Sequence, residues 1–245
     1  MALSTEGKSA MGMSTQEKWR EINRIVRKNS TLIVLLLFWS ALSVVSPNFL
    51  TQGNFLNILL QASNLAIISW GMTLVILLGE IDIAVGSVEA LAGSVAAVLM
   101  VIYKMPTSVG ILGAIVAGLL AGAFTGFLVA RFRIPSMIVT LGMASIARGL
   151  ALILTNGTAV YDLPPFFQFI GQGKVGIIPF PVILALVLFF VTFAILRFTR
   201  FGTNIYATGS NEEAARLSGI NLARVRVAVM TISGVCSAIA GMILA

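Results

Sequence analysis

The chain has 245 residues, of which 58% are hydrophobic and 10% are charged, and its formal net charge is +7. A soluble domain carries about 25% charged residues, so this composition excludes a soluble globular protein and indicates an integral membrane protein. There is no histidine and a single cysteine, Cys236. The sequence therefore lacks the usual general base, the Ser-His triad and a metal-binding cluster. We expect neither catalytic residues nor a metal site.

The N-terminal segment is polar and basic, and we interpret residues 1–30 as a tail on the cytoplasmic side. Its residues 16–28 have the composition of a basic interfacial helix that leads into the bilayer. A basic start followed by the apolar run 31–45 is also typical of a signal peptide. No small-residue cleavage site follows that run, so an uncleaved first span is favoured.

Apolar runs of about 20 residues recur after the tail, each long enough to cross a hydrocarbon core of roughly 30 Å as a helix. We therefore expect an all-α polytopic helical bundle with about seven spans. The expected spans are 31–47, 55–78, one that ends near Tyr103, 108–130, 135–155, 180–196 and one that starts near Val225. The last run reaches Ala245 without a closing charge, which predicts further spans beyond that residue.

Three amides interrupt the second expected span. Asn57, Gln61 and Asn64 are spaced by four and three residues, so they share one face of a helix. In lipid this face must turn towards another helix or a watery path. Two interpretations remain open: hydrogen bonding between helices, or the lining of a route for a hydroxyl-rich solute.

A glycine and two carboxylates break the apolar sequence after this span. Gly79, Glu80 and Asp82 precede a new small-residue run, which carries Glu89. Charged groups beside the membrane are costly unless they are hydrated or paired. Free backbone groups are tolerated there only in a cavity or inside the protein. The pattern is that of an interfacial turn or of a broken helix beside a translocation path.

The fourth expected span has small residues at every fourth position, namely Gly110, Ala114, Gly118, Gly122 and Gly126. Such a ridge permits the close approach of two helix backbones, and we interpret it as a packing surface.

The fifth expected span contains Arg148, the basic residue that lies well inside an apolar segment. An arginine at this depth marks a functional site, a structural ion pair or a side chain that extends to the interface. Its candidate partners are Glu80, Asp82 and Glu89.

Residues 197–226 form the longest polar stretch after the tail. Within it, Ser210 or Asn211 can cap a short helix that has acidic residues in its first turn, Arg216 further on and Gly219 at its end.

The basic residues are distributed unevenly between the two sides of the expected bundle. With the N-terminus inside, 13 Lys and Arg lie on the cytoplasmic side, whereas only Lys104 and Lys174 lie outside. This is a strong positive-inside bias. It places residues 197–226 in the cytoplasm and explains the net charge by membrane orientation, without nucleic acid as a partner.

Three stretches in collinear order resemble the inner-membrane permease of bacterial monosaccharide ABC importers, of the ribose, xylose and galactose type, with relatives that import autoinducer-2. They are GEIDIAVGSVEALAGS, IPSMIVTLGMASIARGLALILTNG and FGTNIYATGSNEEAARLSGI. The resemblance implies that residues 31–245 form a permease domain, with about ten spans in the whole protein. At Gly79-Glu80 the family often has a glycine pair, so this chain carries an additional carboxylate without an assigned role.

The resemblance also implies partners: a second permease copy or homologue in the bacterial inner membrane, a periplasmic sugar-binding protein, and an ABC ATPase. The ATPase would bind ATP and Mg, and this chain itself would hold no cofactor. Residues 197–226 would be a coupling loop seated in the ATPase. Its coupling residues would be Asn211, Glu212, Glu213, Ala214, Ala215, Arg216 and Gly219. A short capped helix tied to two spans suits this role physically, because a partner moves a pore only through a contact that differs between its states.

We therefore expect a permease subunit of an ABC importer for a ribose-like sugar, and not an enzyme. The residues expected near the translocation path are Asn57, Gln61, Asn64, Asp82 and Arg148. The alternative is an ion-coupled secondary transporter in which Asp82, Glu89 and Arg148 form a charge relay. Such a transporter would respond to ionophores and not to ATP depletion.

Overall fold

The computed structural model describes residues 29–245, so the expected basic interfacial helix at 16–28 lies outside the described residues. The chain divides into two units, one that reaches to Phe55 and one from Leu56 to Ala245. In the first unit, α2 (Ser30–Val45) is an apolar helix of 16 residues. The ring of Trp39 in α2 packs edge to face with that of Phe49, which follows the helix, and the ring centroids lie 5.2 Å apart.

The second unit is almost entirely helical, and its first helix, α3, begins four residues before the boundary. The elements are α3 (Gln52–Leu77), α4 (Val85–Ala97), the π-helical turn η1 (Val98–Ile102), α5 (Thr107–Phe132), α6 (Ser136–Leu154), α7 (Pro165–Gln172), β1 (Lys174–Val175), β2 (Ile178–Pro179), α8 (Phe180–Phe198), α9 (Arg200–Ser210), α10 (Glu212–Leu217) and α11 (Leu222–Leu244). The two short strands pair antiparallel, with Val175 opposite Ile178.

Six of the described helices are long and apolar enough to cross a membrane: α3, α4 with η1, α5, α6, α8 and α11. The expected polytopic all-α architecture is therefore confirmed. At 1.5 Å per residue, the 16 residues of α2 reach about 24 Å, less than a hydrocarbon core of roughly 30 Å. A seventh span at 31–47 stays a prediction.

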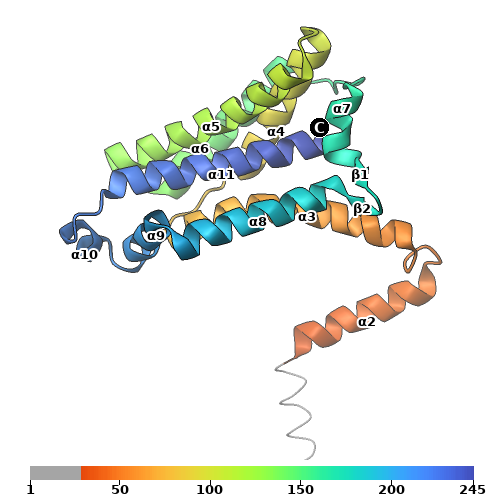
Figure 1. Ribbon diagram of the computed structural model, residues 1–245, viewed down its shortest axis with the longest axis horizontal. Coiled ribbons are helices and arrows are strands. Elements are labelled where there is room, and N and C mark those ends of the chain that lie inside the picture. Colours follow the sequence, from red (N-terminus) through yellow and green to blue (C-terminus); the bar gives the residue numbers. More distant parts are fainter. Residues whose placement is uncertain (1–28) are drawn as a thin grey trace, which may run out of the picture. The chain divides into compact units, whose positions relative to one another are not determined.

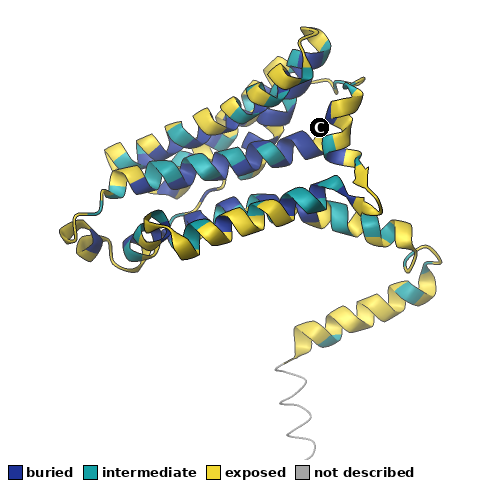
Figure 2. Ribbon diagram, in the orientation of Figure 1, coloured by how far each residue is buried: buried dark blue, intermediate teal, exposed yellow. Residues whose placement is uncertain are grey.

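Helix α11 is the centre of the second unit. In its most apolar window 61% of the residues are buried, compared with 11% in α8. Figure 1 shows α11 beside α5, and Figure 2 shows most of its length coloured as buried or intermediate. Different parts of its length contact different helices: Met230 packs in a cluster with Leu74 of α3, and Ala238 packs in a cluster with Ala92 of α4.

Glycines let α5 and α11 approach closely. A Cβ atom on Gly118 would collide with the carbonyl oxygen of Gly234, and one on Gly122 would collide with the carbonyl oxygen of Met230. The interval of four residues in α5 is therefore a packing ridge, as the sequence predicts. In lipid, where apolar surface alone does not drive helices together, small residues permit the close contacts that stabilise a pair.

We expect Gly122→Val to destabilise the protein, because its Cβ would lie only 2.9 Å from Thr231 Cα on α11 and would collide with the neighbouring carbonyl. Overpacking of this kind costs about 1–3 kcal/mol, and each kcal/mol lowers the unfolding midpoint of a chain this long by roughly 2–4 °C. The measurement is the unfolding midpoint of the detergent-solubilised protein. Gly142→Val on α6 is the matched control, since no atom lies within 4 Å of its added Cβ. Equal midpoints for the two variants would contradict the packing role.

Candidate functional site

The predicted break after the second span is present between α3 and α4. Residues 78–84 are not helical, and Gly79 begins the break in a left-handed conformation with φ of +82°, which glycine adopts at little cost. The N–H of Ile81 donates to the hydroxyl oxygen of Ser136 on α6 at 3.1 Å. Non-helical backbone at this place is therefore stabilised by a neighbouring helix, as a membrane-embedded break requires.

Asp82 fixes the break to α11. Its side chain is 7% exposed and accepts two hydrogen bonds at 2.9 Å, one from the Ser233 hydroxyl and one from the N–H of Ala84. Buried carboxylates are tolerated when such donors satisfy their oxygens. The structure thus places this predicted path residue in the contact between the break and α11.

Glu80, which had no assigned role, pairs with Arg226 in the first turns of α11. The Arg226 Nε lies 2.9 Å from a Glu80 oxygen, and the two side chains are 16% and 13% exposed. The other end of the same guanidinium donates to Glu212 of α10, with Nη2 at 2.7 Å and Nη1 at 3.1 Å from its oxygens. Arg226 therefore connects the membrane break with the polar segment between α9 and α11. Its planar group carries enough donors to bind both carboxylates at once.

Helix α10 is short and capped as the sequence predicts. The side-chain oxygen of Asn211 accepts from the N–H of Ala214 at 3.0 Å, and Gly219 has φ of +83° just after the helix. Within α10 only Ala215 is buried, so most of the helix is exposed. The pairing with Arg226 holds the pKa of the Glu212 carboxyl below its ordinary value, so this contact is charged at neutral pH.

The three predicted amides lie on one face of α3 but differ in their contacts. The side-chain amide of Asn64 donates to a Glu89 oxygen at 2.8 Å, which joins α3 to α4, and Glu89 itself is 8% exposed. Asn57 and Gln61 are exposed and have no hydrogen bond to another side chain in the described part of the chain. Asn64 thus connects two helices by a hydrogen bond. Asn57 and Gln61 lie on the same face of α3 but make no such bond in the described part of the chain.

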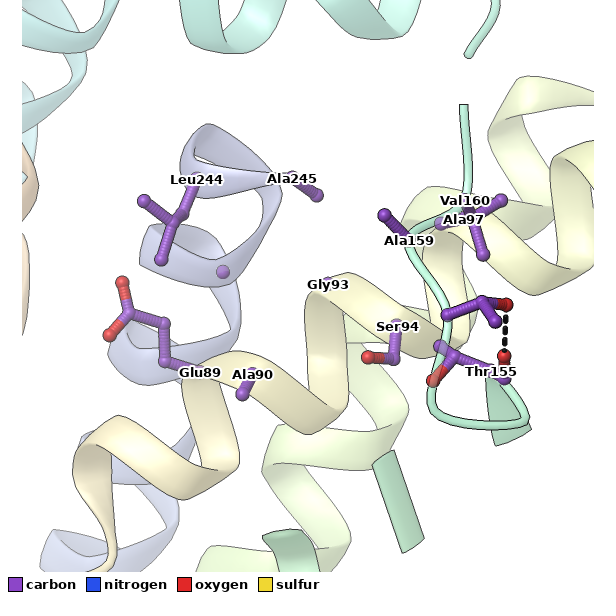
Figure 3. Close-up of a pocket in the computed structure, with 12 residues that line it drawn as sticks. Glu89, Ala90, Gly93, Ser94, Ala97, Thr155, Ala159, Val160, Leu244 and Ala245 are labelled. Carbon is purple, nitrogen blue, oxygen red and sulfur yellow. Dashed lines mark hydrogen bonds between the residues drawn. The ribbon is translucent and has the colours of Figure 1, made fainter. Parts of the chain in front are cut away.

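A pocket of about 340 Å³ lies next to this pair, between α4, the segment that follows α6 and the end of α11. Figure 3 shows Glu89 and Ser94 on α4, with Thr155 on the segment across from them. The Thr158 side chain, also in the lining, donates to the Thr155 carbonyl at 2.8 Å. The lining combines a carboxylate and three hydroxyl groups with small apolar residues, and a few polar groups in a mainly apolar pocket are typical of small-molecule sites.

Arg148 is exposed on α6, and the structure does not bring it to the carboxylates that were its candidate partners. Among residues 29–245 no ion pair joins it to Glu80, Asp82 or Glu89; the ion pairs in this range are Arg216–Glu213, Arg226–Glu80 and Arg226–Glu212. A charge relay through Asp82, Glu89 and Arg148 is therefore not assembled in the described residues.

Residues 54–245 match a family of transport proteins described as the permease component of the branched-chain amino acid transport system. The match covers more than half of the chain. The chain belongs to this permease family. It is therefore a multi-pass component of an inner-membrane transport system, as the six apolar helices also indicate.

Several individual permeases are similar to this chain over most of its length. The ribose import permease protein of Haemophilus influenzae is 39% identical over 227 residues, which cover 91% of this chain and 70% of the relative. The protein of the same name from Escherichia coli K12 is 39% identical, with coverages of 88% and 68%. The L-arabinose ABC transporter permease protein of Azospirillum brasilense is 37% identical, with coverages of 93% and 66%. No solved structure matches the chain.

The arginine that connects this permease's break to α10 was not found by sequence reasoning. Arg226 was counted only as one of several cytoplasmic basic residues, and its partner Glu80 lies 146 positions away. No local spacing signals such a pair. The one available signal was that Glu80 stands where the resembled family often has a glycine. A carboxylate at that position needs a partner beside the membrane.

We expect Glu80→Gln to destabilise the permease more than Glu213→Gln does. Loss of the largely enclosed bond to Arg226 costs about 2 kcal/mol. In contrast, Glu213 pairs with Arg216 on the surface, where the side chains are 64% and 60% exposed. An exposed pair of this kind contributes little to stability, because solvent screens it. The measurement is the unfolding midpoint of each variant at neutral pH. A larger decrease of the unfolding midpoint for Glu213→Gln would show that the Arg226 contact does not stabilise the break.

Proposed function

We propose that the chain forms the translocation path of an ABC importer for a ribose-like sugar. The support for a sugar comes from the relatives, whose names specify ribose and L-arabinose import. The family description names branched-chain amino acids, but the three relatives described above, which align with about nine-tenths of the chain, are named as ribose or L-arabinose permeases. The pocket beside Glu89, with its hydroxyl groups, is compatible with a solute that carries many hydroxyls.

The proposed path passes the polar residues of α3 and α4. Asn57, Gln61 and Asn64 form one row along α3, and Glu89 extends this row onto α4 through its bond to Asn64. Glu89 lines the pocket. Amide and carboxylate groups along such a path give brief hydrogen bonds to sugar hydroxyls, since each such bond contributes only about 1 kcal/mol net. Weak contacts of this kind favour passage over retention. In this proposal Asp82 supports the wall of the path, and Arg148 lies outside the row.

The proposed coupling element is α10. The observation that supports this proposal most directly is the contact of Arg226 with both Glu212 and Glu80. An exposed helix of six residues offers a surface to a partner, and its residue Glu212 is bonded through Arg226 to Glu80 in the break. Movement of α10 by a partner therefore acts on the break through one side chain. We infer that the partner is an ABC ATPase, which binds ATP and Mg and hydrolyses ATP, while this chain contributes no catalytic group and no cofactor.

The basic residues support an orientation with α10 in the cytoplasm. Seven arginines flank the ends of α5, α8 and α11 or lie within α9 and α10: Arg131, Arg133, Arg197, Arg200, Arg216, Arg224 and Arg226. Lys104 and Lys174 follow η1 and begin β1, elements that Figure 1 shows away from α10. The positive-inside rule then places the α10 end inside. The opposite end would receive a periplasmic sugar-binding protein, and a second permease copy would complete the transporter.

The first prediction of this function concerns coupling. Replacement of Glu213→Gln together with Arg216→Gln is expected to abolish ATP-driven sugar uptake and recovery of the ATPase with the tagged permease, because both side chains are exposed on α10. The amount of permease in the membrane should stay unchanged, since Ala215 and the Asn211 cap are untouched. The measurements are uptake by native membranes and the ATPase-to-permease ratio after affinity purification.

A matched control removes one charge of each sign at the other end of the bundle. Lys174→Gln with Asp162→Asn changes two exposed residues and is expected to leave the ATPase ratio unchanged. Undiminished transport in the α10 variant would refute the proposed coupling role, and equal loss in both variants would attribute the effect to charge alone.

The second prediction concerns the cargo and the energy source. The assay uses vesicles that contain the full-length permease with its own ATPase and binding protein, with α10 facing the vesicle interior. These vesicles should accumulate labelled ribose when ATP is supplied in that interior. Leucine should not compete, and an ionophore should leave uptake unchanged. Leucine uptake would instead favour the substrate in the family description. Uptake that stops with an ionophore and persists without ATP would favour the ion-coupled transporter.

A further inference from the structure

A groove of about 710 Å³ lies between the end of α5 and the start of α11. It belongs to neither the proposed path nor the α10 contact, although it lies at the same end of the second unit, where Figure 1 shows these helix ends near α10. Its lining divides into two chemically different parts. The floor is apolar and the rim is basic.

The floor comes from the parts of the two helices that are apolar enough to cross a membrane. Phe127 of α5 is 51% exposed, and Val227 and Ala228 of α11 are half-buried. Ala130 and Ala228 are small, so they leave space between the helices. Because both helices are long and apolar enough to cross a membrane, an apolar floor on them is suited to contact with lipid acyl chains.

The rim carries three arginines, Arg131, Arg133 and Arg224. All three are exposed. In the described part of the chain none of them has a carboxylate within 4.0 Å, in contrast to Arg216 and Arg226, which are paired. Arg133 does lie within electrostatic reach of Glu212, but that carboxylate is bonded to Arg226. The rim therefore presents positive charge that no described residue neutralises.

Arginines above an apolar groove at a helix end match the chemistry of an anionic phospholipid. Guanidinium groups bind phosphate oxygens in planar, two-pronged geometry, and basic pockets between membrane helices on the cytoplasmic side bind anionic head groups. We propose that this groove is a binding site for an anionic phospholipid. The phosphodiester lies between the three arginines and an acyl chain lies along Phe127 and Ala228.

The floor distinguishes a lipid from a soluble partner. A cytoplasmic protein contacts groups beyond the ends of the helices, as α10 offers, whereas Phe127 and Val227 lie within helices that cross the membrane. The site also adjoins the α10 contact, because Arg133 lines a second pocket together with Glu212 and Arg226. A lipid phosphate on Arg133 therefore lies next to the residues that connect α10 to the break.

The test measures lipid binding to the full-length, delipidated permease in detergent by native mass spectrometry. The probes are phosphatidylglycerol and phosphatidylcholine with identical acyl chains. Phosphatidylglycerol is expected to bind more tightly, and the triple variant Arg131→Gln, Arg133→Gln, Arg224→Gln is expected to lose about fivefold in its affinity for each arginine removed. Phosphatidylcholine binding should change little.

The matched control removes the same number of charges from the same end of the protein. Arg197→Gln, Arg200→Gln and Arg216→Gln lie outside the groove and should leave phosphatidylglycerol binding unchanged. A further variant, Ala228→Phe, keeps every charge and fills the floor, so it is expected to weaken binding of both lipids. Ala228 does not line the pocket next to α10, which keeps this variant independent of coupling.

Several outcomes would overturn the proposal. Equal affinity for the two lipids would exclude recognition of the phosphate charge, and an unchanged preference in the triple variant would place the anionic lipid elsewhere. Unchanged binding in Ala228→Phe would show that the lipid does not occupy the groove. If the triple variant kept its lipid and lost the ATPase on purification, the rim would be a protein-docking surface instead.

Discussion

The close contact of α5 with α11 is the constraint on which the rest of the structure depends. Glycines on both helices bring the backbones together, and this contact fixes the position of α11 along its axis. Arg226 and Ser233 are seven residues apart, two turns of a helix, so they lie on one face of α11. That face meets the break between α3 and α4, where Arg226 binds Glu80 and Ser233 binds Asp82. A shift of α11 by one turn would separate both pairs.

The two carboxylates of the break have different consequences for the protein. Asp82 is bonded to neutral donors, Ser233 and the backbone of Ala84, and so behaves as a fixed part of the packing. Glu80 is bonded to a charge that is shared with Glu212, a residue outside the membrane-spanning helices. The first contact gives the break a constant anchor and the second gives it a partner that can move. A permease needs both properties, since a gate must be held in place and yet respond to an external domain.

Local signals in the sequence predicted the local features well. The polar cap and glycine around α10, the glycine interval of α5 and the break at Gly79 depend on residues that are neighbours in the chain, and all three are present. Contacts between distant residues were not predictable in the same way. The pairs Glu80–Arg226 and Asp82–Ser233 depend on the packing of α11. Helix α9 was missed because small and polar residues predominate in it, although Phe201 and Ile205, four residues apart, pack together in the core. The functional roles of Asn57, Gln61 and Arg148 stay predictions.

The glycine of α3 at position 71 has a further consequence. It lies against Cys236, the single cysteine of the chain, which is 5% exposed in the contact between α3 and α11. A thiol enclosed in this way reacts slowly with a maleimide reagent, so cysteines introduced elsewhere can be labelled without first removing it. Any separation of α3 from α11 during the transport cycle would uncover the thiol. The rate of its alkylation would then report the motion of these two helices in the unmodified protein.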